Sequence, residues 1–295
     1  MANLKDIRSR IGSVKNTQQI TRAMKMVSAA KLRKAQDNVI QCRPYAHSIK
    51  ELIDEVYDEE TLQDPRVSGP DHKVGKSLYV VISSDRGLCG GFNNSISKET
   101  YQKHIEFLNN EKKIDYIFVG KKVGVFFESR GIKPKETILN LAKEISFKMA
   151  DKLAEQILED FSQGNYDEIV FVYNKFISAI AQEVTMEKVF PIKDENTIEL
   201  EVEETHLEKV DGIKFEPSKK EILNSLLDKY FTVQVYKCLS ESVAAEHAAR
   251  MSSMESATNN ANDMINKLTL TYNKLRQASI TTELIEITSG AEALN

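Results

Sequence analysis

The sequence has no tryptophan, only three cysteines, and no run of apolar residues long enough to cross a bilayer. Cys42, Cys89 and Cys238 lie far apart and form no CxxC pair, so neither a disulfide framework nor a zinc site is predicted, and a reducing compartment fits. Without a long apolar run, no segment is expected to span a membrane directly. The N-terminus also lacks the apolar segment of a signal peptide. Any association with a membrane is therefore expected to run through other proteins.

Proline and glycine are absent between residues 218 and 289. At a rise of 1.5 Å per residue, one unbroken helix over this stretch would be roughly 108 Å long, which is wider than a globular core. Its apolar side chains recur in alternating steps of three and four residues, as in a coiled coil. These positions are Leu223, Leu226, Tyr230, Val233, Ala244, Met251, Met254, Ala261, Ile265, Leu268, Tyr272 and Leu275. Polar residues interrupt the seam at Lys237, Ser240, His247 and Thr258, and the helix needs a partner to cover it.

The N-terminal stretch, residues 3–57, is predicted to be that partner helix. Its heptad positions are Leu4, Ile7, Ile11, Val14, Gln18, Thr21, Lys25, Ser28, Leu32, Ala35, Val39, Cys42, Ala46, Ile49, Ile53 and Val56. The middle of this register is polar, and there Ile20, Met24 and Val27 supply apolar side chains on another face. We therefore expect the buried face to rotate around the helix in this middle section.

The residues between the two long helices have the pattern of an α/β domain. Strands are predicted at 78–82, 114–119 and 169–173, and helices at 96–108, 121–129 and 144–161. Strands that alternate with helices form a mostly parallel sheet covered on both faces. Residues 180–189 alternate between apolar and polar instead, which predicts an antiparallel edge strand. The acidic stretch 194–211 is predicted to be a loop or a surface hairpin.

The predicted fold class is α/β, with a long antiparallel coiled coil of the N- and C-terminal helices plus a Rossmann-like α/β domain with a mostly parallel sheet. The first coiled-coil helix is placed at 1–57, the globular foot domain at 58–217 and the second coiled-coil helix at 218–295. If residue 57 lies beside residue 218, the C-terminal helix overhangs its partner beyond about residue 274. The core of the foot domain is expected to exclude the coiled-coil seam.

A glycine-rich loop, Ser84–Asn93, follows a predicted strand and precedes a helix, as phosphate-binding loops do. It lacks the GxGxxG pattern and a Gly-Lys-Ser/Thr ending, so a tight structural turn is favoured over a nucleotide site. Gly75-Lys76-Ser77 imitates a P-loop ending but precedes its strand. The histidines show no metal spacing, and no Ser/His/Asp or Cys/His set can be assigned. No catalytic residue, cofactor-binding residue or metal ligand is therefore predicted.

Charge is unevenly distributed along the chain. Residues 1–43 carry ten Lys and Arg against two Asp, whereas residues 194–211 carry eight Asp and Glu against one Lys. The basic helix has no interleaved aromatic residues, so nucleic acid is a less favoured partner than an acidic protein surface. Arg33 and Lys34 are candidates for contacts with such a surface.

The end of the C-terminal helix differs from the rest of it. Beyond the predicted overhang the heptad positions become Ser279, Thr282 and Glu286, and the seam ends. Leu284, Ile285 and Ile287 remain apolar although no partner helix is left to cover them. An apolar helix end that stands alone indicates a socket in another protein.

Three blocks of sequence resemble a known family. They are Ile7–Val27 with Arg43-Pro44-Tyr45, then Ser84–Asn93, and then Ala249-Arg250-Met251 together with Tyr272–Ala291. In these blocks, and along its whole length, the chain resembles the gamma subunit of the bacterial rotary ATP synthase, the proton-translocating enzyme. The acidic stretch 194–211 departs from that pattern.

This resemblance implies the central rotor shaft of the synthase, which couples proton flow through a membrane ring to ATP synthesis or hydrolysis in a catalytic hexamer. It implies a non-catalytic subunit without cofactors, peripheral to the cytoplasmic face of the bacterial plasma membrane. The implied partners are the alpha and beta subunits of the hexamer, the epsilon subunit and the ring of c subunits. The implied contacts with the catalytic head are Met24, Arg276, Gln277, Thr281 and Glu283.

Two other classes of function stay open on the residues alone. The chain could be a nucleotide-binding α/β enzyme that uses the Ser84–Asn93 loop and oligomerises through its coiled coil. It could also be a coiled-coil scaffold with no role in energy coupling. Binding of ATP by the isolated chain favours the first, and co-purification with an ATPase hexamer favours the shaft.

Overall fold

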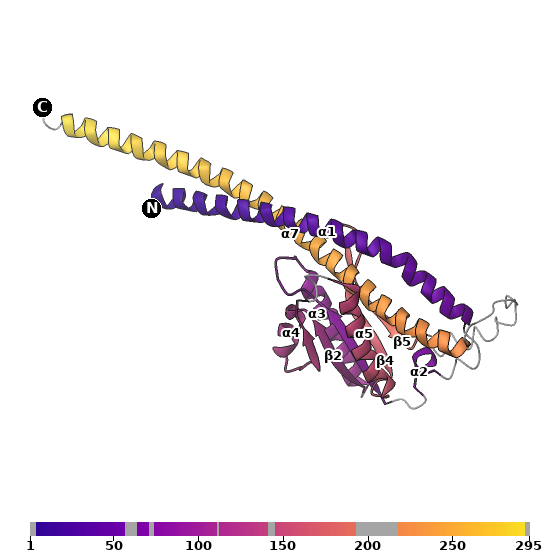
Figure 1. The fold of residues 1–295 in the computed structure, drawn as a ribbon. Helices are drawn as coiled ribbons and strands as arrows, with labels where there is room; N and C mark the ends of the chain where they lie inside the picture. Colours follow the sequence, from indigo (N-terminus) through magenta and orange to yellow (C-terminus); the bar gives the residue numbers. More distant parts are fainter. Residues whose placement is uncertain are drawn as a thin grey trace. The chain divides into compact units, whose positions relative to one another are not determined.

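The computed structural model describes residues 4–56, 64–70, 74–110, 112–140, 145–192 and 218–292. Its elements are α1 (Leu4–Val56), α2 (Pro65–Ser68), β1 (Lys76–Ile82), α3 (Phe92–Asn109), β2 (Lys113–Val119), α4 (Lys121–Glu128), β3 (Glu136–Ile138), α5 (Phe147–Ser162), β4 (Glu168–Phe176), β5 (Gln182–Phe190) and α7 (Lys219–Glu292) (Figure 1). The predicted strands and helices are confirmed, and only the short α2 and β3 were not predicted. The acidic stretch 194–211 lies outside the described residues.

The chain forms two compact units, each built from both long helices. The first contains residues 1–29 and 250–295, and the second contains residues 30–249. The domain boundaries predicted at residues 57 and 218 stay a prediction.

The long C-terminal helix begins where the sequence predicted. The hydroxyl of Ser218 accepts the N–H of Glu221 at 3.3 Å, so Ser218 is the N-cap of α7. With no proline or glycine before Gly290, nothing interrupts the helix for 74 residues.

In the first unit, α1 and α7 pair antiparallel through polar contacts. Thr21 and Thr258 join their hydroxyls at 2.8 Å, Lys25 Nζ meets Glu255 Oε1 at 2.6 Å, and Gln18 donates to Asn262 at 3.4 Å. The numbers of the paired residues sum to 279 or 280, which places Leu4 opposite about residue 276. The predicted overhang is therefore confirmed to within a few residues.

The predicted rotation of the buried face on α1 is wrong. Thr21 and Ser28 are buried, at 8% and 3% exposure, whereas the apolar Ile20 and Val27 are 60% and 58% exposed. The original heptad register holds because the polar side chains find partners across the helix pair, so no apolar substitute is needed there. Ile20 and Val27 form an exposed apolar stripe instead.

The second unit contains a five-stranded sheet in the order β3-β2-β1-β4-β5. The first four strands run parallel, and β5 pairs antiparallel with β4, as predicted for residues 180–189. The chain moves outward from β1 to β2 and β3 and then returns to β4 on the other side of β1. This order is the doubly wound, Rossmann-like arrangement, with its switch point between β1 and β4.

The two faces of the sheet bury separate clusters. On one face, Val81 and Phe118 pack against Val123 and Phe127 of α4 and Ile96 of α3. The other face is covered by α5 and by both long helices. Its cluster joins the sheet residues Leu78, Val80 and Phe171 to Ile157 of α5, to Ile49 and Ile53 of α1, and to Leu223, Tyr230, Phe231 and Val233 of α7.

The expectation that the foot core excludes the coiled-coil seam is therefore wrong. Seam residues of both long helices supply one wall of the core beneath the sheet. Phe231 and Leu239 lie off the predicted seam and are also buried, at 0% and 2% exposure. In this unit α7 is surrounded by protein on more than one side, because the sheet as well as α1 packs against it.

Candidate coupling surface

The predicted contact residues near the C-terminus lie on the exposed end of α7 in the first unit. Arg276, Gln277, Thr281 and Glu283 are all exposed. Their hydrogen bonds are local to the helix: Thr281 Oγ1 donates to the carbonyl of Gln277 at 3.0 Å, and Ser279 donates to Glu283 at 3.3 Å. These side chains remain accessible to a partner.

An apolar stripe runs between these polar residues. Ile280, Leu284 and Ile287 are spaced i, i+4 and i+7, so they share one face of α7, and their exposed fractions are 49%, 58% and 67%. At 3.6 residues per turn, Arg276 and Glu283 border one side of this stripe, and Gln277 and Thr281 border the other. The face is shaped like a binding surface, with an apolar centre and polar edges. Ile280 was not among the predicted contact residues, although its spacing from Leu284 and Ile287 identifies it.

Met24 lies on α1 of the same unit and is half-buried beside the exposed Ile20 and Val27. In the register of the helix pair it lies opposite about residue 256. Arg276 is about 20 residues further along α7, or roughly 30 Å at 1.5 Å per residue. The structure therefore does not bring Met24 together with the helix end, and the two belong to separate contact regions.

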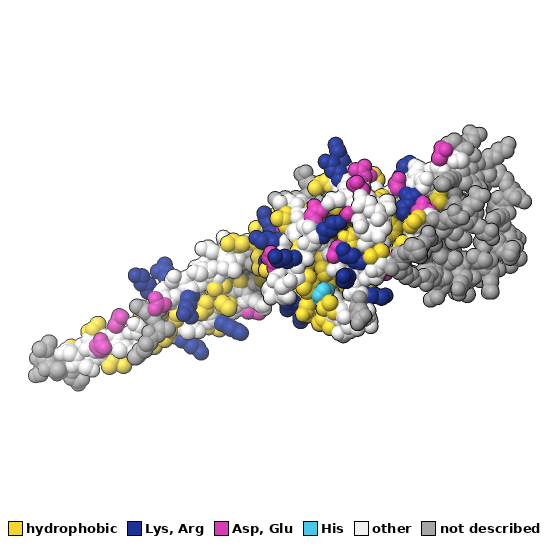
Figure 2. All heavy atoms as spheres, turned by 90° about the horizontal axis from the view of Figure 1, so that it is seen from below, with side chains coloured by type: hydrophobic (Ala, Val, Ile, Leu, Met, Phe, Trp, Pro, Cys, Tyr) yellow, Lys and Arg dark blue, Asp and Glu magenta, His cyan; other side chains and the backbone are white. Residues whose placement is uncertain are grey.

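Arg33 and Lys34 lie in the second unit, where both are exposed on α1. Among the residues that the structure describes, neither side chain has an ion-pair partner. Figure 2 shows one face of the molecule, on which Lys and Arg side chains are interspersed with hydrophobic ones. Long basic side chains with free ends suit an acidic partner surface.

The Ser84–Asn93 loop is a structural turn packed against protein. Cys89 and Phe92 cluster with Ala245 and Ala249 of α7, whose exposed fractions are 0% and 5%. The side chain of Asn93 accepts the N–H of Ser84 at 3.0 Å and so closes the turn on itself. Side chains of α7 therefore lie against one side of the loop. This geometry does not favour the nucleotide-binding alternative.

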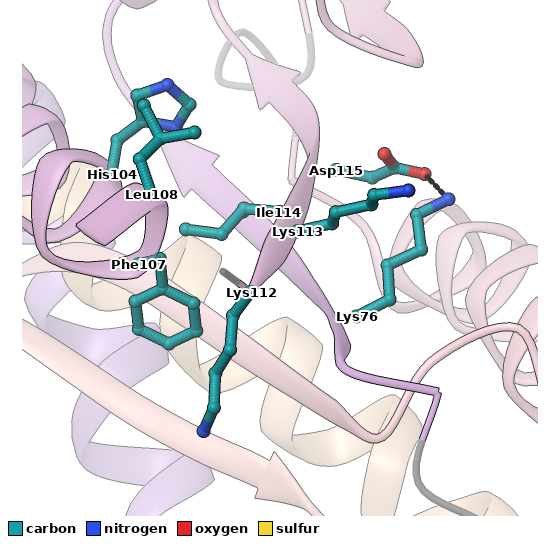
Figure 3. Close-up of a pocket in the computed structure, with 8 residues that line it drawn as sticks. All are labelled: Lys76, His104, Phe107, Leu108, Lys112, Lys113, Ile114 and Asp115. Carbon is teal, nitrogen blue, oxygen red and sulfur yellow. Dashed lines mark ion pairs between the residues drawn. The ribbon is translucent and has the colours of Figure 1, made fainter. Parts of the chain in front are cut away.

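A surface cavity of about 300 Å³ lies where β1 and β2 begin, beside the end of α3 (Figure 3). Lys76 is bound to Asp115 at 2.6 Å, and Lys112 and Lys113 point in different directions, so these cations do not converge on one anion. His104 bonds the hydroxyl of Tyr116 at 3.0 Å, and burial lowers the pKa of His104. The lining therefore offers no arrangement for acid–base chemistry.

The described ranges also contain no group of three or more His, Cys, Asp or Glu side chains placed to hold a metal ion. Burial raises the pKa of the Cys42 and Cys238 thiols, which makes both poor nucleophiles. None of the helices in those ranges is long and apolar enough to cross a membrane. Contact surfaces, rather than a reactive centre, are what the described residues provide.

Comparison with known proteins identifies the family. A family model described as ATP synthase matches residues 3–294. The chain is 51% identical to the ATP synthase gamma chain of Bdellovibrio bacteriovorus over 295 residues, covering all of this chain and 99% of that protein. It is 44% identical to the gamma chain of Geobacter metallireducens, with the same coverage of both proteins.

A solved structure of similar fold supports the assignment. It is a chain from the central stalk and c-ring structure of the Tetrahymena thermophila mitochondrial ATP synthase, with a TM-score of 0.61 and 28% identity. The match covers 81% of this chain and 99% of that chain. The helix pair, the doubly wound sheet and these relatives lead to one assignment: the chain belongs to the ATP synthase gamma chain family, the non-catalytic rotor subunits of the central stalk.

Proposed function

We propose that this subunit transmits rotation between the proton-driven ring of c subunits and a catalytic head of alpha and beta subunits, without taking part in the reaction itself. The observation that carries the proposal is the end of α7, which extends past α1 with the apolar stripe Ile280, Leu284 and Ile287 uncovered. A helix pair resists bending. The uncovered end of one helix can bind in a socket of a partner and still rotate there.

The proposed contacts with the head divide into two regions. Arg276, Gln277, Thr281 and Glu283 would meet the socket around the apolar stripe. Met24, with Arg33 and Lys34 further along α1, would meet the surface that changes as the shaft turns. Exposure of all these side chains except the half-buried Met24 supports this division.

The foot is proposed to bind the c-ring and the epsilon subunit on the cytoplasmic face of the bacterial plasma membrane. Support comes from the relatives, which are bacterial gamma chains, and from the similar chain in a structure named for the central stalk and c-ring. The subunit would thus be peripheral and attached to the membrane through the ring.

Co-expression of the tagged full-length chain with alpha and beta subunits tests the proposal. We compare Leu284→Asp at the exposed end of α7 with Val125→Asp at a similarly exposed position of α4. The wild type and Val125→Asp should co-purify with both subunits equally. Leu284→Asp should weaken association by about tenfold, because burying a leucine is worth at least ~1.5 kcal/mol. A wild-type chain that binds neither subunit would refute the proposal.

A further inference from the structure

Glu241 of α7 connects three elements of the second unit. Its side chain is only 1% exposed. Oε1 accepts from Arg43 of α1, at 3.0 Å from Nε and 2.8 Å from Nη2. Oε2 accepts the backbone N–H of Phe176, the last residue of β4, at 3.1 Å. One carboxylate thereby holds α1, α7 and the sheet together.

A second polar junction lies one helical turn away on α7. Lys237 donates to Glu187 Oε1 of β5 at 2.8 Å, and the hydroxyl of Tyr173 of β4 donates to Glu187 Oε2 at 2.6 Å. Burial alone would raise the pKa of Glu187, but the bonds from Lys237 and Tyr173 hold that pKa below its ordinary value. Glu187 is therefore ionised at neutral pH and ties the edge of the sheet to α7.

Four alanines lie next to these junctions on α7. Ala244, Ala245, Ala248 and Ala249 are all buried, with exposed fractions of 5% or less. Alanine side chains make shallow contacts that oppose sliding or twisting of one element past another only weakly. A carboxylate that accepts from two directions cannot shift without losing a charge-assisted bond.

Burial of these charges is not explained by stability alone. Glu241 is buried while Arg43 stays half exposed, and the attraction between them offsets only part of the hydration that the carboxylate loses, so the pair fixes position more than it adds stability. The position fixed here is that of the sheet relative to both long helices. A subunit that turns under load needs this connection to be stiff.

We propose that Glu241, with Arg43, is a positioning residue that transmits load between the sheet and the two long helices while the subunit rotates. This inference rests on the proposed shaft function. Lys237 and Glu187 act as a second connection at the same level of α7. Glu241 was not predicted from the sequence, because a carboxylate at an off-seam position of a long helix has the pattern of a solvated side chain.

Glu241→Gln in the assembled synthase tests the inference. Glutamine keeps the acceptor for the N–H of Phe176 but loses the charge that holds Arg43, whose side chain is 48% exposed and can turn to water. Lys103→Met is the matched control, since it removes an exposed ion pair with Glu106 on α3. The readout is the rate of ATP hydrolysis that occurs without proton pumping. It is measured in inverted vesicles, once without a proton gradient and once against one.

Glu241→Gln should assemble and should hydrolyse ATP at the wild-type rate without a gradient. Against a gradient, its hydrolysis without pumping should rise about tenfold, the factor expected for losing one charge-assisted hydrogen bond. Arg43→Lys keeps one charged donor. Its hydrolysis without pumping should therefore lie between that of the wild type and that of Glu241→Gln. A merely structural role would lower assembly and leave the dependence on the gradient unchanged.

The outcomes separate this inference from the shaft function. If the wild type couples pumping to hydrolysis but Glu241→Gln behaves like Lys103→Met under load, the inference is wrong and the shaft function stands. If the wild type itself does not couple, the shaft function fails. If Glu241→Gln does not assemble, Arg43→Lys decides, and wild-type behaviour of that variant under load overturns the proposal.

Discussion

At the scale of single residues, the helix pair of the first unit reverses the usual relation between polarity and burial. Thr21 and Ser28 face the partner helix, and Ile20 and Val27 face outward. The hydroxyl of Thr258 also donates to the carbonyl of Met254 at 2.7 Å, so both threonine hydroxyls of this layer have partners. Polar layers of this kind fix the register of a coiled coil at some cost in stability. The exposed apolar stripe is then free to contact another protein.

This arrangement predicts that one added charge has very different effects on stability at two adjacent positions. Thr21→Asp places a carboxylate at a site that is 8% exposed, where Lys25, one turn away, is already paired with Glu255, and it should destabilise the helix pair by about 2 kcal/mol through desolvation. Ile20→Asp, at 60% exposure, should change stability by no more than about 0.5 kcal/mol. Thermal unfolding of the isolated full-length chain, followed by circular dichroism, measures both. Equal losses would mean that the buried face does rotate onto Ile20.

At the scale of the elements, most of the fold could be predicted because its signals are local. The apolar runs of β1, β2 and β4 and the alternation in β5 identify strands, and the capping residue Ser218 identifies the start of α7. β3 was missed because three residues, Glu136–Ile138, are too few to show a period. Its strand character comes from pairing with β2, which is a tertiary contact.

The environment of α7 was harder to predict, because a heptad pattern reports only one partner. Phe231, Val235 and Leu239 are apolar and off the seam, and this was the available signal that a second surface covers the helix. The functional residues also differ in how far the sequence predicts them. The exposed end of α7 could be predicted, because its apolar residues have no partner helix. Glu241 is identified only by its bonds to Arg43 and Phe176.

The stiffness of α7 can be tested in the first unit at Ala261, which is on the seam and 7% exposed. Ala261→Pro removes one hydrogen bond of the helix and clashes with the preceding turn, at a cost of ~3 kcal/mol or more. Ala261→Gly costs only about 1 kcal/mol and imposes no bend. The proline variant should therefore lose assembly or pump fewer protons per ATP hydrolysed, and the glycine variant should be much milder.

The matched measurement is ATP-driven proton pumping in inverted vesicles divided by the rate of hydrolysis. Both variants should keep the sheet of the second unit folded, because Ala261 belongs to the other compact unit. Hydrogen exchange of β1 and β4 in the isolated chain checks this. A proline variant that assembles and pumps at the wild-type ratio would mean that α7 bears no torque at this point.

At the scale of the whole molecule, the charge distribution suits a rotor that slides past its partners. The net charge is only −4, but the first 43 residues carry a large positive excess, with Arg33 and Lys34 exposed on α1. Charge pairs at an exposed surface are weak and exchange rapidly with water and salt. A surface of this kind can steer a partner without holding it in one orientation.

Reversing Arg33 and Lys34 to Glu should therefore slow coupled turnover while leaving the isolated fold intact. Each exposed pair contributes less than about 1 kcal/mol, so the loss should be kinetic and should shrink as salt screens the new repulsion. Lys121→Glu with Lys122→Glu, at the start of α4, is the matched control for an equal change in net charge. The measurement is coupled ATP turnover at low and at high salt for both double variants. If Arg33→Glu with Lys34→Glu turns over at the wild-type rate at low salt, the basic face of α1 does not meet an acidic surface of the head.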